Sequence, residues 1–405
     1  MIRPAISGVG VVSAFGLGAR AFFDGLAQGR AAVGPIRGFD VSTFPVRVAA
    51  EVPELPALQR VRDRKIALGL AAAGEAWRDA GCTGADRGAA LVAAVGLEQA
   101  ALQDFVPLFE AGRIDWSRAP AAALPATPFR APIDGVLRAL AAGLELGGPR
   151  IGHVSACAAG ALAVAHAAAL VQRGEHDIVL AGATDSMVNP LGLGGMARLG
   201  APSPRAAPDA CRPFDRRRDG LVMGEGAAFF VVENEERARA RGARVQARIA
   251  GWGSTQDGYR VTAPRPDGRS AARAIAKALA RAGVPAEAVG YVNAHGTGTP
   301  LNDPAEVSAL RLALGAHANR VPLSSIKGAI GHLMAASGAI ELAACLLPLG
   351  RGPMPGTAHH QVPDPACDVD VIGETPRPGA VELALSNSFG FGGQNAAVLL
   401  ARGEP

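Results

Sequence analysis

The sequence is poor in aromatic residues, which make up 4% of its 405 residues, and its charges nearly cancel to a net +4. Its basic residues are scattered, which argues against a nucleic-acid-binding protein, because such a protein concentrates them in a stripe. No uninterrupted apolar run approaches the ~20 residues that a transmembrane helix needs. The N-terminus also lacks the long apolar stretch of a secretory signal. We therefore predict no partnership with nucleic acid and no association with a membrane.

Cysteines are few, odd in number and far apart, and no two of them form a CxxC pair. This pattern does not resemble a disulfide framework or a zinc site. It predicts reduced thiols and a cytoplasmic protein. The five cysteines are Cys82, Cys157, Cys211, Cys345 and Cys367.

Almost half of the residues are apolar, so the chain can bury a substantial core. Runs rich in β-branched residues alternate with Ala-rich stretches, which indicates an α/β fold. A duplicated core with five layers, α-β-α-β-α, would account for all of the predicted strands and helices. Its two halves are predicted at residues 1–240 and 241–405. Strands are predicted at 5–12, 89–95, 150–155, 178–183, 227–232, 244–251, 288–292, 381–386 and 396–400. Helices are predicted at 62–80, 158–173, 269–282, 303–314 and 330–347.

Cys157 has a distinctive context, because it lies between an apolar strand and an Ala-rich helix. At the first turn of a helix the aligned peptide dipoles favour an anion by ~0.3–1 kcal/mol. A thiolate is the reactive form of cysteine, so this position predicts a nucleophile with a lowered pKa. The alternative, a small buried hydrophobe, is our interpretation of the other four cysteines.

Two histidines lie in glycine-rich surroundings. His295 follows a predicted strand and begins the run His-Gly-Thr-Gly-Thr, and His332 is predicted just inside a helix, five residues after Lys327. A lone histidine is more often a structural hydrogen-bonding group, and we interpret the other six histidines in that way.

A third glycine-rich segment, residues 386–395, reads SNSFGFGGQN and predicts a close backbone approach. It lacks the lysine and hydroxyl of a P-loop. The N-terminal segment 8–13 lacks the third glycine of a dinucleotide fingerprint, so a Rossmann function is disfavoured.

Together, and in this order, these motifs closely resemble the β-ketoacyl synthases of the thiolase superfamily. The resemblance spans most of the chain and is strongest from Gly152 onward; the segment 215–226, DRRRDGLVMGEG, also matches. It implies an acyltransferase that performs a decarboxylative condensation with a malonyl-type extender on an acyl carrier protein, in fatty-acid, polyketide or polyene biosynthesis. No catalytic cofactor is implied, since substrates arrive on the carrier's phosphopantetheine.

The resemblance also implies roles. Cys157 would accept the acyl group, with its own amide and that of Phe391 as an oxyanion hole, and Phe391 would gate the pocket. His295 and His332 would assist decarboxylation. Lys327 would orient the second histidine, His332, through a network that includes Asp303 and Glu306. Thr297 and Thr299 would bind the pantetheine arm. A structural monovalent cation would be held by Asn293, Glu341, Ser386 and Asn387. For Asp303 and Glu306 the alternative is that they form the capped, solvated start of a helix. For the four residues assigned to the cation, the alternative is buried polar packing.

An acyl carrier protein is acidic, so a basic rim beside the pocket is expected. The clusters that we assign to it include Arg62, Arg64, Lys65, Arg198 and Arg205, although runs of charge often merely solvate a helix face. The protein is expected to form a homodimer, or a heterodimer with a related ketosynthase-like subunit.

The segment 95–100, VGLEQA, departs from the glycine-serine-glycine turn of enzymes that elongate fatty acids, which favours a specialised polyketide or polyene pathway. Gln394 is compatible with both fatty-acid and polyketide synthesis. Two other functions compete with condensation. One is a chain-length-factor-like partner subunit, which the presence of Cys157 opposes, and the other is a carrier-protein binder without activity.

Overall fold

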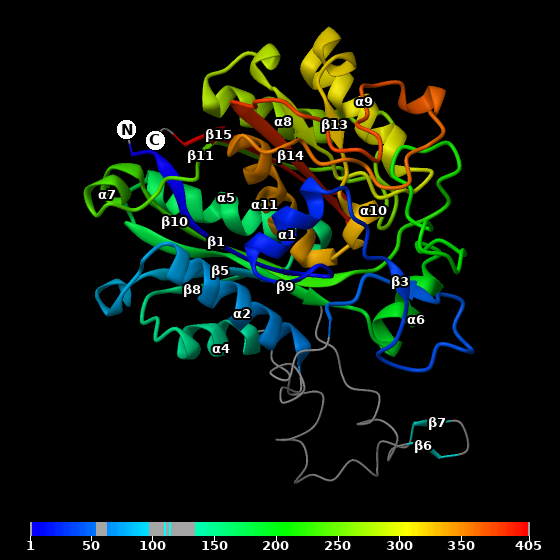
Figure 1. Cartoon of the computed structure of the whole chain (residues 1–405), viewed down its shortest axis with the longest axis horizontal. Coiled ribbons are helices and arrows are strands. Elements are labelled where there is room, and N and C mark those ends of the chain that lie inside the picture. The colour runs from blue at the N-terminus through cyan, green and yellow to red at the C-terminus, as the bar shows by residue number, and fades with distance from the viewer. Residues whose placement is uncertain (1, 54–62, 97–108, 111–112, 115–133, 404–405) are drawn as a thin grey trace.

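One large mixed sheet runs through the protein and carries both halves of the chain (Figure 1). The computed structural model describes residues 2–53, 63–96, 109–110, 113–114 and 134–403. The sheet order is β13-β12-β14-β15-β11-β1-β10-β9-β5-β8. The strands that make up this order are β1 Pro4–Ser13, β5 Ala90–Val95, β8 Arg150–His153, β9 Ile178–Ser186, β10 Glu225–Asn234, β11 Ala247–Gln256, β12 Tyr291–Asn293, β13 Leu323–Ser324, β14 Leu383–Gly390 and β15 Gln394–Arg402. A further short strand, β2 (Gly16–Leu17), pairs with β1 outside this order.

The two ends of this order repeat one pairing pattern. In the series β1-β10-β9-β5-β8 the first two pairs are antiparallel and the last two are parallel. The series β11-β15-β14-β12-β13 has the same directions. The two series meet where β1 pairs with β11. This repetition supports the division at residues 240 and 241, between α7 (Glu235–Ala240) and β11, which stays a prediction.

Helices cover both series and separate them, which gives the five expected layers (Figure 1). Helices α2 and α4 pack on the outer face of the first series, and α8 and α9 cover the second. Helices α5 and α11 lie between the two and are buried almost all round, as a helix between two sheets must be. Their bounds are α2 Arg64–Asp79, α4 Gly135–Gly143, α5 Ala159–Gln172, α8 Arg269–Ala282, α9 Asn302–Leu314 and α11 Ser337–Leu349.

Glycines in β1 and β11 bring an outer helix onto each strand. A Cβ at Gly8 would lie 2.2 Å from the carbonyl oxygen of Ala76 in α2, and one at Gly253 would lie 2.1 Å from that of Ala274 in α8. The glycines near the N-terminus therefore serve helix packing, which agrees with the low weight given to a dinucleotide fingerprint there.

The central helices α5 and α11 cross at a pair of glycines. A Cβ at Gly160 would lie 2.6 Å from the amide nitrogen of Ala339, and one at Gly338 would lie 2.6 Å from that of Ala161. Cys157 precedes α5 and His332 precedes α11, so this contact sets the spacing between two segments of the site.

Every predicted strand is present, with shifted ends, and four of the five predicted helices match within about two residues. The predicted helix 330–347 is wrong at its start. Helix α10 (Lys327–Ile330) is followed by Gly331, whose φ of 72° only glycine adopts readily, and α11 begins at Ser337. No helix among the described residues is both long and apolar enough to span a membrane.

We predict that Gly160→Ala lowers the free energy of unfolding by about 1–3 kcal/mol, because the added methyl group must force α5 and α11 apart. Urea denaturation measures this change. Gly88→Ala is the control, since a Cβ there meets nothing within 4 Å. Equal effects of the two substitutions would contradict the proposed packing constraint.

Candidate active site

Cys157 lies on a tight turn between β8 and α5. The chain leaves β8 at His153 and enters the 3-10 turn η7 (Ala156–Ala158), which runs directly into α5. Ala156 has a φ of 46°, a conformation that is uncommon for a residue other than glycine and that is often found at functional sites. Cys157 therefore stands at the start of the helix as predicted, and only 3% of its surface is exposed.

The pKa of the Cys157 thiol is raised to about 11, mainly because burial disfavours the thiolate. The Lys327 ammonium and the backbone N–H of Phe391, which points at the sulfur, lower the pKa by less. The prediction of a lowered pKa is therefore wrong, because desolvation outweighs the favourable charges. The resting group is therefore a thiol.

His295 follows β12 and is held by two buried carboxylates at the start of α9. Glu306 accepts hydrogen bonds from the backbone N–H groups of His295 at 2.9 Å and Gly296 at 2.8 Å. Asp303 accepts from the N–H of Thr297 at 3.0 Å. Both carboxylates are almost fully buried, so the alternative of a solvated helix start is wrong.

Lys327 contacts His295 and forms a buried ion pair with Glu341. Its ammonium lies 3.2 Å from Nδ1 of His295 and 2.6 Å from that residue's carbonyl oxygen. Since an ammonium only donates hydrogen bonds, Nδ1 accepts and the imidazole carries its proton on Nε2. Lys327 thus orients the first histidine, whereas the expectation that it orients His332 is wrong.

His332 lies in an irregular segment between α10 and α11, outside the helix in which it was predicted. The N–H of Met334 donates to its Nδ1 at 3.1 Å, and the Ser337 hydroxyl lies 2.8 Å from the same atom. Its proton is therefore also on Nε2. The backbone of His332 pairs with Val222 at 2.7 Å and with Gly224 at 2.9 Å, which fixes the segment from the other side.

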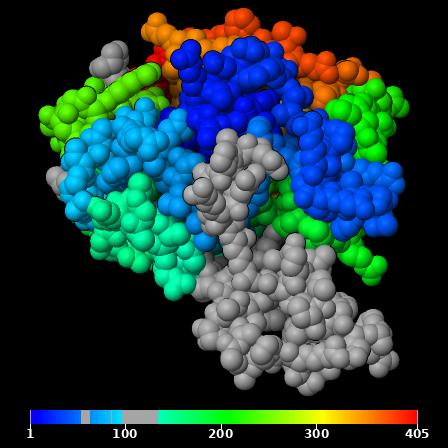
Figure 2. Space-filling model, turned by 60° about the horizontal axis from the view of Figure 1, so that its bottom comes forward, coloured from blue at the N-terminus to red at the C-terminus, as the bar shows by residue number. Residues whose placement is uncertain are grey.

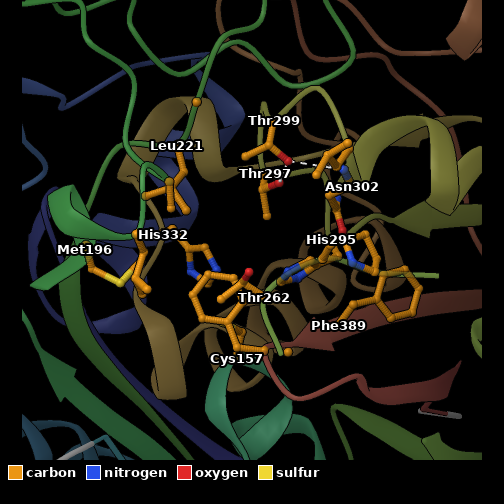
Figure 3. Close-up of a pocket in the computed structure, with 18 of the residues that line it drawn as sticks. Cys157, Met196, Leu221, Thr262, His295, Thr297, Thr299, Asn302, His332 and Phe389 are labelled. Carbon is orange, nitrogen blue, oxygen red and sulfur yellow. Dashed lines mark hydrogen bonds between the residues drawn. The ribbon is translucent and has the colours of Figure 1, made fainter. Parts of the chain in front are cut away.

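The two imidazoles meet edge to face, with ring centroids 5.4 Å apart and ring planes at 84°. Burial and the Lys327 charge hold the pKa of each histidine well below its usual value, so both rings stay neutral. Together with Cys157 they line one cavity of about 350 Å³. Figure 3 shows Cys157 at one end of this cavity, with the two histidines on opposite sides.

Thr297 and Thr299 line the same cavity, and their hydroxyls lie 2.9 Å apart. Phe391 lines it beside the nucleophile. The structure thus brings together all the predicted catalytic, gating and pantetheine-binding residues except Lys327, which lies directly behind His295.

Sequence analysis missed a second loop at the cavity, which contributes Thr262, Ala263 and Pro264. This loop is tied to the glycine-rich loop after β14: the N–H of Gly392 donates to the carbonyl of Val261 at 2.6 Å, and the Asn395 amide donates to Asp257 at 2.8 Å. Its only sequence signal is the irregular run after residue 256, since long loops commonly line pockets.

The predicted basic rim is only partly placed at the cavity. Arg62 and most of the segment 95–100 lie outside the described residues. Arg64 forms a two-pronged ion pair with Glu225, and Lys65 is 2% exposed, so neither side chain offers a free charge to a partner. Arg198, by contrast, is exposed next to Leu199 at the cavity, and Arg205 pairs with Asp219, which lines it.

The sequence matches the family described as "Beta-ketoacyl synthase, N-terminal domain" over residues 3–238 and the corresponding C-terminal domain over residues 246–361. The chain belongs to the β-ketoacyl synthase family. It is 36% identical to 3-oxoacyl-[acyl-carrier-protein] synthase 2 of Coxiella burnetii, over 99% of this chain and 98% of that one. It is 39% identical to the oxytetracycline polyketide putative beta-ketoacyl synthase 1 of Streptomyces rimosus, over 98% and 96%.

Two solved structures are similar over the whole chain. One is the AntDE:AntF complex of a type II polyketide acyl carrier protein with its ketosynthase, with a TM-score of 0.88 and 28% identity over 99% of this chain and 100% of that one. The other is the ishigamide ketosynthase/chain length factor, with a TM-score of 0.87 and 33% identity over 100% of both. The predicted family and thiolase-like fold are thereby confirmed.

We predict that iodoacetamide alkylates Cys157 about tenfold faster for each unit of pH between about pH 7 and 9, because the thiolate fraction rises tenfold per unit below a pKa of about 11. Mass spectrometry of the peptide that contains residue 157 measures the rate, and Cys157→Ser gives the background. A rate that levels off near neutral pH would contradict the raised pKa.

Proposed function

We propose that the protein is an acyltransferase that condenses an acyl group on Cys157 with a malonyl unit carried by an acyl carrier protein. The observation that carries this proposal is the pair of neutral imidazoles, both with a proton on Nε2, in the cavity that holds the thiol. Two such donors suit an oxyanion that exists only during decarboxylation.

In the first half-reaction Cys157 attacks an acyl thioester. A bond forms between its sulfur and the acyl carbon, the bond to the carrier's pantetheine sulfur breaks, and the thiol proton leaves with the pantetheine thiol. The amides of Cys157 and Phe391 would hold the oxyanion, and losing one such donor typically costs ~2.7–4 kcal/mol of transition-state stabilisation. The Phe391 N–H that points at the sulfur supports this arrangement.

In the second half-reaction a malonyl thioester loses carbon dioxide and leaves an enolate. Nε2–H of His295 and Nε2–H of His332 donate to its oxygen, and its carbon attacks the acyl-cysteine. The Cys157 sulfur departs and takes up a proton, so the product is a β-ketoacyl carrier protein. Thr297 and Thr299 would bind the pantetheine arm, and Phe391 would gate the cavity. No catalytic cofactor is required by this scheme.

A partner subunit is expected at β8, the strand at one end of the sheet order. Among the described residues this edge carries no further strand, and Val154 beyond it is 50% exposed. Exposed sheet edges favour pairing with another chain. We infer a homodimer, or a heterodimer like the ketosynthase/chain length factor to which the fold is similar. Cys157 and both histidines favour the active subunit over the chain-length-factor role.

Three of the four residues that were assigned to a monovalent cation have side chains suited to bind it. The side-chain oxygens of Asn293, Ser386 and Asn387 are buried and have no hydrogen-bond partner among the described residues. Uncharged oxygens of this kind would hold a monovalent cation, which would add a fixed positive charge near Glu306. Glu341 fits less well, because it already pairs with Lys327. The free cysteines favour a reducing compartment, so we place the protein in the cytoplasm.

Replacement of His295 or His332 by Ala should lower condensation by about 10²–10³-fold, because each variant loses one donor to the enolate. Acylation of Cys157, followed by intact mass, should persist. Malonyl carrier protein is the substrate, and condensation is followed both by the β-ketoacyl product and by the released carbon dioxide. His176→Ala is the control, because His176 is not among the residues that line the cavity. Carbon dioxide release at the background rate in the unaltered enzyme would reject the proposed function.

Exposed apolar and basic side chains surround the mouth of the cavity. Leu199, Val261 and Leu301 are 53%, 78% and 63% exposed, and Arg198 and Arg260 lie directly beside the first two. An acidic carrier protein would find both complementary charge and apolar contact here. We propose this mouth as the docking surface.

Arg198→Glu should raise KM for malonyl carrier protein several-fold and leave turnover of a malonyl thioester of N-acetylcysteamine nearly unchanged. Both substrates carry the malonyl carboxylate, but only the carrier protein adds an acidic surface that Arg198 could contact. Arg320→Glu is the matched control, because Arg320 is also exposed but lies beyond the far end of α9. Equal losses with both substrates would assign Arg198 a role inside the enzyme.

A further inference from the structure

Asp185 is a fully buried carboxylate to which the proposed reaction assigns no role. It lies next to the last residue of β9, and none of its surface is exposed. Burying an ionised carboxylate is costly unless hydrogen bonds and opposite charges compensate it. A charged group that is held at such a cost close to a catalytic cavity is a candidate for a role in the reaction.

The two oxygens of Asp185 accept hydrogen bonds from backbone groups on two different segments. Oδ1 accepts from the N–H of Ser186 at 2.8 Å, and Oδ2 accepts from the N–H of Ala335 at 2.9 Å. Ala335 is the middle residue of the 3-10 turn η10 (Met334–Ala336), which follows His332. Asp185 thus ties β9 to a turn that lies 150 positions further along the chain.

The turn η10 transmits this contact to His332. The N–H of Met334 donates to Nδ1 of His332 at 3.1 Å and so keeps the imidazole proton on Nε2. Met334 has a φ of 47°, a conformation that persists in a residue other than glycine only where its surroundings hold it. The hydrogen bond from Ala335 to Asp185 is one such restraint, and it acts one residue beyond the strained position.

Gly96 leaves room for the carboxylate, and Lys65 supports its charge. A Cβ at Gly96 would lie 2.3 Å from both oxygens of Asp185. Burial raises the pKa of Asp185 to about 6, and the N–H of Ala335 and the Lys65 ammonium oppose that rise. Figure 2 shows the light-blue segment that contains α2 on the surface beside the teal segment that contains α4, yet Lys65, in the first turn of α2, is buried. Its buried charge favours the anionic form of Asp185.

The same carboxylate also acts on the nucleophile through its charge. Burial is the main cause of the raised pKa of the Cys157 thiol, and the negative charge of Asp185 adds to it. The turn η7, which contains Cys157, lies in contact with η10. Removal of the charge should therefore help the thiol and harm His332, whereas loss of a purely structural group would harm both.

We propose that Asp185 is a positioning residue for decarboxylation, whose carboxylate holds η10 so that Nε2–H of His332 faces the malonyl thioester. This inference rests on the proposed function, because it uses the role given there to His332. Asp185 touches no substrate and transfers no proton in this scheme.

The test uses the full-length enzyme with the malonyl thioester of N-acetylcysteamine for decarboxylation and the hexanoyl thioester for acylation of Cys157. Asp185→Asn keeps the shape of the side chain but replaces one acceptor oxygen by an NH2 group, which cannot accept from a backbone N–H. It should lower kcat for carbon dioxide release about ten- to a hundredfold and leave KM nearly unchanged, because a displacement of about 1 Å at a catalytic group costs that much. Acyl-enzyme formation, followed by intact mass, should persist, and iodoacetamide should alkylate Cys157 faster than in the unaltered enzyme.

Glu233→Gln is the matched control. Glu233 is a fully buried carboxylate on the neighbouring strand β10, and it accepts hydrogen bonds from Ser7, Arg237 and Arg241, none of which lines the cavity. This variant should lower the melting temperature and preserve the ratio of the two half-reaction rates.

Equal losses of both half-reactions in Asp185→Asn, or carbon dioxide release at the unaltered rate, would overturn the inference. Should Asp185→Asn fail to fold, Gly96→Ala, which crowds the same carboxylate, decides the question through the same ratio. Failure of the proposed function looks different, because the unaltered enzyme would then release carbon dioxide only at the background rate.

Discussion

The site depends on one buried ammonium group. Lys327 is 1% exposed, pairs with Glu341 and donates to both Nδ1 and the carbonyl oxygen of His295. Glu341 supports the ammonium although burial raises the pKa of this carboxyl group to about 7. Removing one partner of a buried ion pair typically costs ~3–5 kcal/mol, because the other charge is left uncompensated. The same ammonium fixes the tautomer of His295 and lowers the pKa of both histidines, so a structural ion pair also determines the chemistry.

The duplicated fold explains how distant residues reach this ion pair. Cys157 lies in η7, directly before α5 of the first half, whereas His332 precedes α11 and His295 follows β12 in the second. Helices α5 and α11 share the middle layer and touch at Gly160 and Gly338. Because both helices are buried between sheets, neither can shift without disturbing the core, so the nucleophile and the donors keep their relative positions.

The sequence allowed much of this arrangement to be predicted. Its alternation of patterns predicted the α/β layers, and its motifs predicted which residues share the cavity. It could not show that Lys327 contacts His295, because the two residues are 32 positions apart and the contact depends on tertiary packing, not on spacing along the chain. It also misplaced Lys65, since a charged residue in a helical pattern gives no sign of being buried. The cluster of Met187, Met196, Met223 and Met334 around Cys157 was equally hidden, because its members are separated along the chain by up to 147 residues.

Burial has opposite effects on the two kinds of catalytic group. It keeps His295 and His332 neutral, which makes both rings suitable donors to an enolate, and it also raises the pKa of Cys157 and thus weakens the resting nucleophile. A more exposed cavity would yield more thiolate, but water would then compete for the enolate oxygen and weaken each donated hydrogen bond. Under the proposed function this arrangement would favour the decarboxylative half-reaction, and acylation would rely on positioned amides and on loss of the thiol proton as the substrate binds.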